Sequence, residues 1–250
     1  MNIKLSAVIV AHNEEHQIKE CIESLKFADE IVLIDQESTD STAGLAKKAG
    51  ASVFRHKNEP GPLLDVSKNF GIEKATGEWI LLIDADERIT TSLAEEILSR
   101  IKSVTEPSAF RIPRKNYVFG SRQSGGGYDY QIRLFRKGKA RYTEPKLHKQ
   151  MTVSGKMETL SNDMIHFSLP DIDTHLKKML FYSKAQSLEI IGEGRRLNVI
   201  NLILNPLKHF IRVYIIERRF IDGISGYIFA MNSAMLEFLK WVNVWEVKND

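Results

Sequence analysis

The sequence is poor in cysteine and has no apolar run long enough to cross a membrane. Its single cysteine, Cys21, excludes an internal disulfide and a metal site built from several cysteines, and fits a reducing compartment. The longest uncharged stretch near the C-terminus, residues 223–236, is shorter than the roughly 20 residues of a spanning helix. Residues 1–6 lead directly into a strand-like segment, without the apolar region and cleavage site of a signal peptide. These absences predict a cytoplasmic protein.

The chain also lacks a large excess of either positive or negative charge. The chain has 35 Lys and Arg against 32 Asp and Glu, a net charge of +3. This excess is too small to indicate a nucleic-acid-binding protein, but it suits anionic partners such as phosphates or acidic lipid headgroups. With 250 residues, 43% of them hydrophobic, the chain is long enough for one large domain or a domain with an appendage.

The first hundred residues alternate strand-like and helix-like segments. The spacing predicts strands at residues 5–11, 31–34, 52–55 and 79–83, with helices after residue 13, before residue 50 and over residues 64–75. Asn13 is a candidate cap for the first helix, whose apolar positions recur every three or four residues. Strands that alternate with helices favour a parallel, doubly wound α/β sheet.

The pattern changes from about residue 109. Residues 109–114 and 130–135 alternate like half-exposed strands, and the glycine run 125–127 between them predicts a mobile loop. Beyond Pro170 the sequence becomes helical. The pair Asn205-Pro206 predicts the start of a helix that reaches about residue 220, and a last helix is expected over residues 227–245.

Polar clusters stand at the ends of three predicted strands, where open α/β sheets bind their ligands. The clusters are His12-Asn13-Glu14, residues 35–40 and Asp84-Ala85-Asp86-Glu87. Two carboxylates one residue apart, next to a rigid buried strand, suit Mg²⁺ or Mn²⁺, which can neutralise charge on a leaving diphosphate. The alternative is that Asp84 to Glu87 only caps the following helix. The apolar strand before the triplet and the two other clusters favour a metal site.

These segments resemble family 2 glycosyltransferases of GT-A fold, and among them the lipopolysaccharide core β-glucosyltransferases. The segments that carry the resemblance are VIVAHNEE (8–15), IVLIDQESTDST (31–42), SKNFGIEKATGEWILLIDADE (67–87), YQIRLFRKGKARY (130–142), FIDGISGYIFA (220–230) and FLKW (238–241). The resemblance implies a mixed, mostly parallel sheet in a GT-A domain over residues 1–168, with a C-terminal helical extension over residues 169–250. Residues 1–104 are then the nucleotide-sugar-binding half and residues 105–168 the acceptor-side half.

The resemblance also implies roles for individual residues around the donor. The residues expected to border the nucleotide-sugar are Ala11, Asn13, Glu14, Asp35, Asp40, Lys68, Asn69, Asp84 and Ala85. The expected ligands of Mn²⁺ or Mg²⁺ are Asp84, Asp86 and His148, with contact to the diphosphate or a purely structural role as the alternatives for His148. Gln36 stands where the family often has a second acidic residue, and Asp40 or Ser41 has the alternative role of capping the next helix. Lys68 could contact the diphosphate as a point charge, and the alternative is that it is an ordinary exposed lysine on the surface of its helix.

An inverting transfer needs a general base for the acceptor hydroxyl. The candidates are Asp129 and Glu144, with Asp129 favoured because the neighbouring glycine run could close over bound donor. The related subgroup commonly has a His-Glu pair where this chain has His148-Lys149, so the expected carboxylate is absent there. Arg133 and Arg136, three residues apart on a strand, should point to opposite faces, so that at most one faces the donor.

The helix after Pro206 combines an apolar face with basic residues, and aromatic residues recur up to Trp245. Such a helix can lie in a membrane interface, and the alternative is a helical cap packed on the catalytic domain. We therefore expect a hexosyltransferase that moves a sugar such as glucose from UDP-glucose onto a lipid-linked or lipopolysaccharide-type glycan at the cytoplasmic face of the membrane. The alternatives are a sugar-phosphate nucleotidyltransferase, which the acidic loop after the first strand disfavours, and a non-catalytic nucleotide-sugar-binding scaffold.

Overall fold

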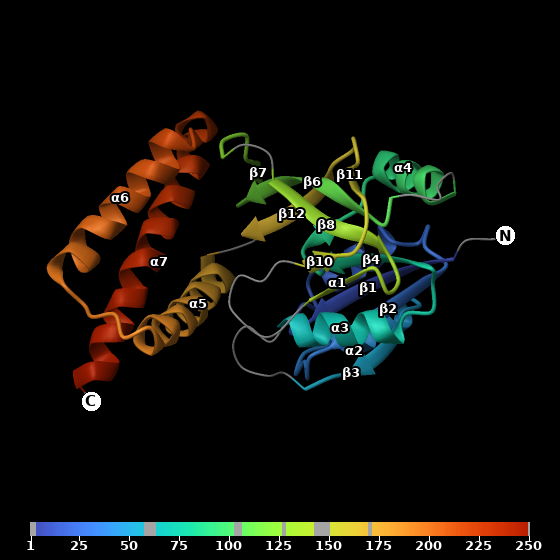
Figure 1. Ribbon diagram of the computed structural model, residues 1–250, viewed down its shortest axis with the longest axis horizontal. Helices are drawn as coiled ribbons and strands as arrows, with labels where there is room; N and C mark the ends of the chain where they lie inside the picture. Colours follow the sequence, from blue (N-terminus) through green and yellow to red (C-terminus); the bar gives the residue numbers. More distant parts are fainter. Residues whose placement is uncertain are drawn as a thin grey trace. The chain divides into compact units, whose positions relative to one another are not determined.

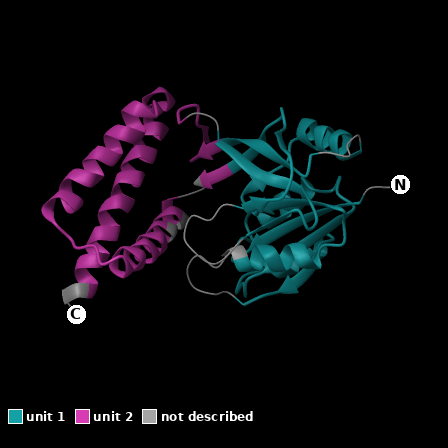
Figure 2. Cartoon of the chain, in the orientation of Figure 1, with its two compact units in different colours: residues 1–115, 129–166 teal, residues 116–128, 167–250 magenta. Residues whose placement is uncertain are grey.

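The computed structural model describes residues 4–57, 64–102, 107–126, 129–142, 151–169 and 172–249. The chain forms two compact units (Figure 2). The first unit contains residues 1–115 and 129–166, and the second contains residues 116–128 and 167–250. The second unit therefore includes a short hairpin that interrupts the first unit in the sequence.

The chain begins with four strands separated by helices (Figure 1). These elements are β1 (Leu5–Ala11), α1 (Ile18–Glu23), β2 (Glu30–Asp35), α2 (Thr42–Lys48), β3 (Ser52–Arg55), α3 (Leu64–Lys74) and β4 (Trp79–Asp84). Then follow β5 (Glu87–Arg88), α4 (Thr91–Lys102), β6 (Ala109–Val118), β7 (Ser121–Arg122), β8 (Asp129–Arg136), β9 (Ala140–Tyr142), β10 (Met151–Val153), β11 (Met157–Thr159) and β12 (Met164–Leu169). The four strands predicted before residue 84 are all present, each within a residue of its predicted bounds.

The sheet is mixed, with the order β3-β2-β1-β4-β8-β6-β12-β5. The first four strands pair in parallel, and β8 joins β4 in the antiparallel direction. Alternate side chains of β1 enter two different cores, as a strand buried on both faces requires. Ile9 packs with Ile18 and Ile22 of α1 in one core, whereas Val8 packs with Ile72 of α3 in the other. The predicted mixed α/β class is confirmed.

Gly71 lets α3 lie close against β1. A Cβ atom at this position would lie 2.6 Å from Cγ1 of Val8 and 3.0 Å from Cγ1 of Ile34, both deep in the sheet. Because these are branched core side chains with little room to move, any larger residue would push α3 away from the strands. The backbone of α3 is thereby fixed against β1 and β2.

The predicted capping role of Asn13 is wrong. The helix α1 begins only at Ile18, and Asn13 has a left-handed backbone with φ of 54°. Its Oδ1 atom accepts a hydrogen bond from the backbone N–H of Thr39 at 2.8 Å. An asparagine tolerates this conformation better than most residues, and here its side chain serves the neighbouring loop rather than the helix.

The second unit is built from helices. They are α5 (Ile172–Gly192), a π-helical turn (Ile200–Leu204), α6 (Asn205–Ile211), a second π-helical turn (Arg212–Ile216), a 3-10 turn (Arg219–Asp222) and α7 (Gly223–Asn249). Asn205 does not cap a helix as predicted, because residues 200–216 form one continuous helical segment and Asn205 is already helical. The wide π-helical turn before Pro206 fits a residue that lacks a backbone N–H. In the part of the chain that the structure describes, no helix has the length and apolarity needed to span a membrane.

The hairpin residues of the second unit contact its 3-10 turn. The backbone N–H groups of Ser124 and Gly125 both donate to Asp222, and Gly126 donates to the carbonyl of Glu217 at 2.5 Å. A Cβ atom on Gly125 would lie 2.7 Å from the carbonyl oxygen of Arg218, so this contact requires glycine. Gly127, the last glycine of the run, lies outside the described residues.

Candidate active site

The loops that follow β1 and β2 are joined by hydrogen bonds between side chains and backbone. Nδ1 of His12 lies 2.6 Å from the carbonyl oxygen of Gln36, and the N–H of Asn13 donates to Ser38 at 3.0 Å. Ala11 and Asp35 are direct neighbours across the two parallel strands. The structure thus brings Ala11, Asn13 and Asp35, all predicted to border the nucleotide, to the same sheet edge.

Asp40 holds this pair of loops together. Its Oδ2 atom accepts from the N–H of Glu15 at 3.1 Å, and its Oδ1 atom accepts from the N–H of Thr42 at 2.9 Å. Burial raises the pKa of Asp40, but the hydrogen bonds from Thr42 and Glu15 outweigh it and hold the pKa below its usual value. Because Thr42 begins α2, Asp40 satisfies the first backbone N–H of that helix, although the N-cap position itself is Ser41, whose side chain makes no cap hydrogen bond. The N–H of Glu14 donates to the hydroxyl of Thr42 at 2.8 Å, so this residue belongs to the same network.

Asp84 lies between two cationic side chains. Nζ of Lys68 is 3.0 Å from one of its carboxylate oxygens, and the guanidinium of Arg133 contacts the other. Burial raises the pKa of Asp84, but the charges of Arg133 and Lys68 hold it far below the usual range of a carboxyl group. In return, the neighbouring Asp84 raises the pKa of Lys68 despite its burial. Lys68 is therefore an ion-paired residue and not a solvated helix lysine.

Glu87 is the centre of a wider charge network and is fully buried. Its Oε1 atom lies 2.6 Å from Arg133 and 3.2 Å from Arg114, and its Oε2 atom accepts from the backbone N–H of Asp84 at 3.0 Å. Arg114 continues to Asp129 at 2.7 and 2.8 Å. Acidic and basic groups therefore alternate from Lys68 to Asp129. This chain of ion pairs links Asp84, which was predicted to bind the metal and the donor, to Asp129, which was predicted to be the general base.

Arg133 and Arg136 separate as predicted. Arg133 is buried between Asp84 and Glu87, whereas Arg136 pairs with Glu78 and stacks on Trp79. Neighbouring acidic groups raise the pKa of Arg133 although its burial opposes this. A buried guanidinium with two carboxylate partners is a fixed positive charge beside the polar strand ends.

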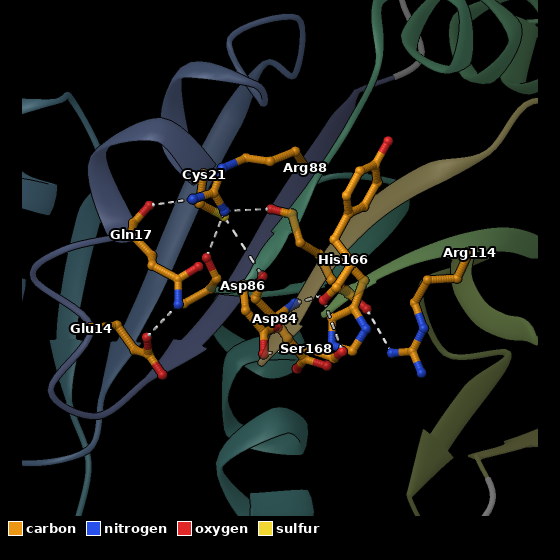
Figure 3. Close-up of polar contacts among 12 residues, drawn as sticks. Glu14, Gln17, Cys21, Asp84, Asp86, Arg88, Arg114, His166 and Ser168 are labelled. Carbon is orange, nitrogen blue, oxygen red and sulfur yellow. Dashed lines mark hydrogen bonds and ion pairs between the residues drawn. The ribbon is translucent and has the colours of Figure 1, made fainter. Parts of the chain in front are cut away.

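Asp86 faces a different environment from Asp84. Its Oδ1 atom is buried, and no hydrogen-bond donor reaches it from the described residues. Its Oδ2 atom lies 3.5 Å from Nε2 of His166, because the short β5 pairs with β12 and sets His166 opposite Glu87 (Figure 3). A buried carboxylate oxygen without a donor is costly, and coordination of a cation removes that cost.

His166 was missed by the sequence analysis. It stands in an alternating segment, Met164–Leu169, that carries no recognisable metal motif, and only the β5–β12 pairing brings it to Asp86. The predicted ligand His148 and the predicted base Glu144 lie outside the described residues. Within the described ranges, no three His, Cys, Asp or Glu side chains form a ready cluster for a metal ion. Two carboxylates still suit Mg²⁺ or Mn²⁺, which keep positions for water and substrate phosphates.

Asn69 connects α3 to β9. Its side-chain Nδ2 donates to the carbonyl of Tyr142 at 2.8 Å, and its Oδ1 accepts from the N–H of Tyr142 at 3.0 Å. The ring of Tyr142 lies 5.7 Å from Nζ of Lys68. Both polar atoms of the Asn69 side chain are thus bonded to the backbone of Tyr142, and these bonds help to position Lys68 and Tyr142.

The alternative role for Asp84 to Glu87, capping of the next helix, is not what the structure shows. The next helix, α4, begins at Thr91, and the hydroxyl of Thr90 accepts from the N–H of Leu93 at 3.3 Å. The triplet lies instead in the turn between β4 and β5.

The model of the family described as "Glycosyl transferase family 2" matches residues 6–164, which include this turn and every strand end described above.

The chain belongs to glycosyl transferase family 2. A relative from Rhizobium meliloti (strain 1021), "Lipopolysaccharide core biosynthesis glycosyltransferase LpsC", is 31% identical over 98% of this chain and 93% of its own. "Uncharacterized glycosyltransferase RC0292" from Rickettsia conorii is 26% identical over 97% of this chain and 90% of its own. Both similarities extend through the second unit, beyond the part that the family model matches. The predicted family, and with it the prediction of an enzyme, is confirmed.

A solved structure agrees with the fold of this family 2 glycosyltransferase. The structure of S. aureus TarS, residues 1–349, superposes with a TM-score of 0.51 at 14% identity. The match covers 99% of this chain and 92% of that one. The GT-A fold implied by the sequence motifs is therefore confirmed.

Proposed function

We propose that this family 2 glycosyltransferase transfers a hexose from a UDP-sugar to a lipopolysaccharide-core or other cell-surface glycan, with inversion and with Mn²⁺ or Mg²⁺. The observation that carries the metal dependence is the buried Oδ1 atom of Asp86, which no donor among the described residues satisfies. Asp84 and Asp86 would hold the cation, with His166 as the nearest nitrogen ligand. When bound, the cation neutralises charge on the departing diphosphate.

Lys68 and Arg133 are the proposed partners of the diphosphate. Both cations already contact Asp84, at the end of the strand where the donor is expected. A phosphate oxygen can replace a carboxylate oxygen at a guanidinium or ammonium group, because the two acceptors carry similar charge and geometry. The loop residues Asn13 and Asp35 then lie toward the nucleoside end, at the neighbouring strands of the same edge.

Asp129 is the proposed general base within the described residues. In the reaction, the acceptor oxygen attacks the anomeric carbon, the bond from that carbon to the diphosphate oxygen breaks, and the hydroxyl proton passes to the base. The guanidinium of Arg114 pairs with Asp129 at 2.7 Å, and the side-chain amide of Gln131 donates to it at 2.8 Å, so these two contacts hold the carboxylate in a fixed position. Glu144 remains the other candidate.

A lipid-linked acceptor requires the enzyme to work at a membrane surface, and the second unit has suitable side chains. Of the 25 large hydrophobic side chains that are exposed in the described part of the chain, 23 belong to this unit. Five form an exposed stripe along one helical segment, 45 to 59% exposed: Ile200, Ile203, Leu207, Ile211 and Ile215. The packed face of the same segment is separate, since Phe210 and Tyr214 contact Tyr227 of α7. Packing within the unit therefore does not account for the stripe.

Positive charge accompanies this apolar surface. The second unit has 12 Lys and Arg against 9 Asp and Glu, whereas the first unit has 23 of each, so the whole excess of the chain lies in the second unit. Lys208 and Arg212 are exposed directly beside the stripe. This combination favours partial insertion into an anionic membrane interface without crossing the membrane.

Release of nucleoside diphosphate tests the enzymatic proposal. With Mn²⁺ and a panel of nucleotide-sugars, the protein should slowly release UDP from one UDP-sugar, and Asp86→Asn should remove this activity while the fold is kept. A nucleotidyltransferase would instead form pyrophosphate from a nucleoside triphosphate and a sugar phosphate. Binding of donor without any turnover, even with glycan acceptors, would identify a scaffold protein and refute the proposal.

Sedimentation with vesicles tests the membrane proposal separately. The protein should bind phosphatidylglycerol vesicles at low salt and phosphatidylcholine vesicles weakly. The double variant Leu207→Ser and Ile211→Ser should bind less, whereas Val66→Ser, at an exposed apolar position of the first unit, should bind like the unchanged protein. Absence of binding to anionic vesicles at low salt would exclude this role for the second unit.

A further inference from the structure

Arg88 follows the Asp84-Ala85-Asp86-Glu87 turn directly, and its side chain folds back onto the backbone of that turn. Its side chain is only 10% exposed. One terminal nitrogen donates to the carbonyl oxygens of Ala85 and Glu87 at 2.7 and 2.9 Å (Figure 3). The carbonyl of Ala85 belongs to the residue between the two proposed metal carboxylates, so Arg88 is bonded to the middle of the proposed metal turn.

The other terminal nitrogen of Arg88 reaches the loop after β1. It donates to the carbonyl oxygen of Gln17 at 3.0 Å, at the start of α1. Gln17 in turn donates from its side chain to Glu14 at 3.4 Å, and its backbone N–H donates to the carbonyl of Glu14 at 3.0 Å. A single guanidinium therefore connects the metal turn to the loop that is predicted to border the nucleotide (Figure 3).

Backbone carbonyls, and not only opposite charge, hold this guanidinium in place. Its ion pair with Glu20 is 3.4 Å long, and the side chain of Glu20 is 77% exposed. A buried guanidinium is costly, and hydrogen bonds in its fixed planar geometry offset that cost. A lysine at this position would keep the charge but could not reach acceptors on both segments in the same fork.

Two weaker contacts join the same pair of segments. Sγ of Cys21 lies 3.7 Å from the carbonyl oxygen of Asp84, and the N–H of Ile89 donates to the hydroxyl of Ser24 at 3.2 Å. Both Cys21 and Ser24 belong to α1 or its end. The helix therefore supports the turn along its length, with Arg88 as the strongest connection.

We propose that Arg88 is a positioning residue that fixes the metal turn relative to the nucleotide loop, so that cation and nucleoside diphosphate bind as one unit. This inference rests on the proposed function. A bound nucleoside diphosphate would span the two segments, with its phosphates at the turn that carries Asp84 and Asp86 and its nucleoside at the loop after β1. If the segments move independently, each ligand loses the part of its affinity that depends on the other. Residues behind metal ligands commonly change metal affinity by about 10–100-fold when they are replaced.

The test measures binding rather than turnover. Mn²⁺ binding is followed by the electron paramagnetic resonance signal of free Mn²⁺, with and without UDP, and UDP binding by calorimetry. In Arg88→Lys we expect Mn²⁺ affinity in the presence of UDP to fall about 10–100-fold, and the mutual enhancement between Mn²⁺ and UDP to be lost. In Arg88→Ala, added guanidinium at concentrations that leave the unchanged protein folded should restore part of that enhancement. Glu20→Ala is the matched control and should bind both ligands like the unchanged protein.

The outcomes separate this inference from the proposed function. If the unchanged protein binds neither Mn²⁺ nor UDP, the proposed function fails. If it binds both and Arg88→Lys binds them equally well, only the role of Arg88 is refuted. A loss of thermal stability in both Arg88 variants without a change in ligand affinity, or variants that are unfolded before any ligand is added, would show that Arg88 supports the fold alone and would also overturn the inference.

Discussion

Replacement of Glu87 by glutamine should destabilise the first unit strongly, although the two side chains have nearly the same shape. Glu87 is fully buried and carries the only carboxylate that contacts both Arg133 and Arg114 among the described residues. The glutamine amide removes the negative charge and turns a donor toward one of these guanidinium groups. Loss of one partner from a buried ion pair costs about 3–5 kcal/mol, because it leaves an uncompensated buried charge.

The remaining contacts place the expected effect at the lower end of that range. Arg133 keeps Asp84, and Arg114 keeps Asp129, so neither guanidinium is left without a carboxylate. We therefore expect Glu87→Gln to cost about 3 kcal/mol. For a chain of this size, that corresponds to a fall in Tm of about 6–12 °C.

Thermal unfolding followed by circular dichroism measures the effect. Glu78→Gln is the matched control, because it also neutralises the partner of an arginine, but at a site that is half exposed. An exposed pair contributes about 0–1 kcal/mol, so the control should melt close to the unchanged protein. Equal melting temperatures for the two variants would refute the view that Glu87 is the electrostatic centre of the site.

Two further predictions concern the frame around the site. Gly71→Val should lower the free energy of unfolding by about 1–3 kcal/mol, measured by urea unfolding, because even the added Cβ atom overlaps Val8. The control is Gly44→Val, where no atom lies within 4 Å of the added Cβ. It should change the free energy of unfolding by no more than an exposed helix substitution does. Asp40 has a lowered pKa in the folded protein, so its contribution to stability is complete above the unfolded value of about 3.9 and is lost as the pH falls below it. Asp40→Asn should therefore flatten the acid side of the stability profile between about pH 4 and pH 2, and an unchanged slope would contradict the capping contacts.

The sequence was sufficient for the first four strands and for the sheet edge at which their polar ends lie. A strand such as β4, which is apolar at every position before Asp84, can only be buried on both faces, and the polar residues after it must then emerge at the sheet edge. The same logic placed Ala11, Asn13 and Asp35 at neighbouring strand ends. Local pattern and strand connection determine these positions, so they needed no knowledge of long-range contacts.

The helix ends were less predictable. Asn13 and Asn205 both have the residue type of a helix cap, but one bonds to the loop after β2 and the other lies inside a continuous helix. Capping signals describe a local preference of about 1 kcal/mol, which a contact with another segment readily outweighs. Gly71 likewise reads as an unfavourable residue within a helix until its contact with β1 is known.

By itself, the sequence determined the α/β class, the family and the sheet edge that carries the carboxylates, because these follow from periodicity and from motifs that are continuous in the chain. Only the tertiary structure decided which charges meet. Arg133 comes to Asp84 from 49 positions away, His166 comes to Asp86 through the pairing of β5 with β12, and Arg88 joins the carbonyl of Ala85 to that of Gln17. Such pairs depend on strand order and on the direction of buried side chains, which no local pattern encodes. The Asp84-Ala85-Asp86 triplet is thus visible in the sequence, whereas the residues that position it are not.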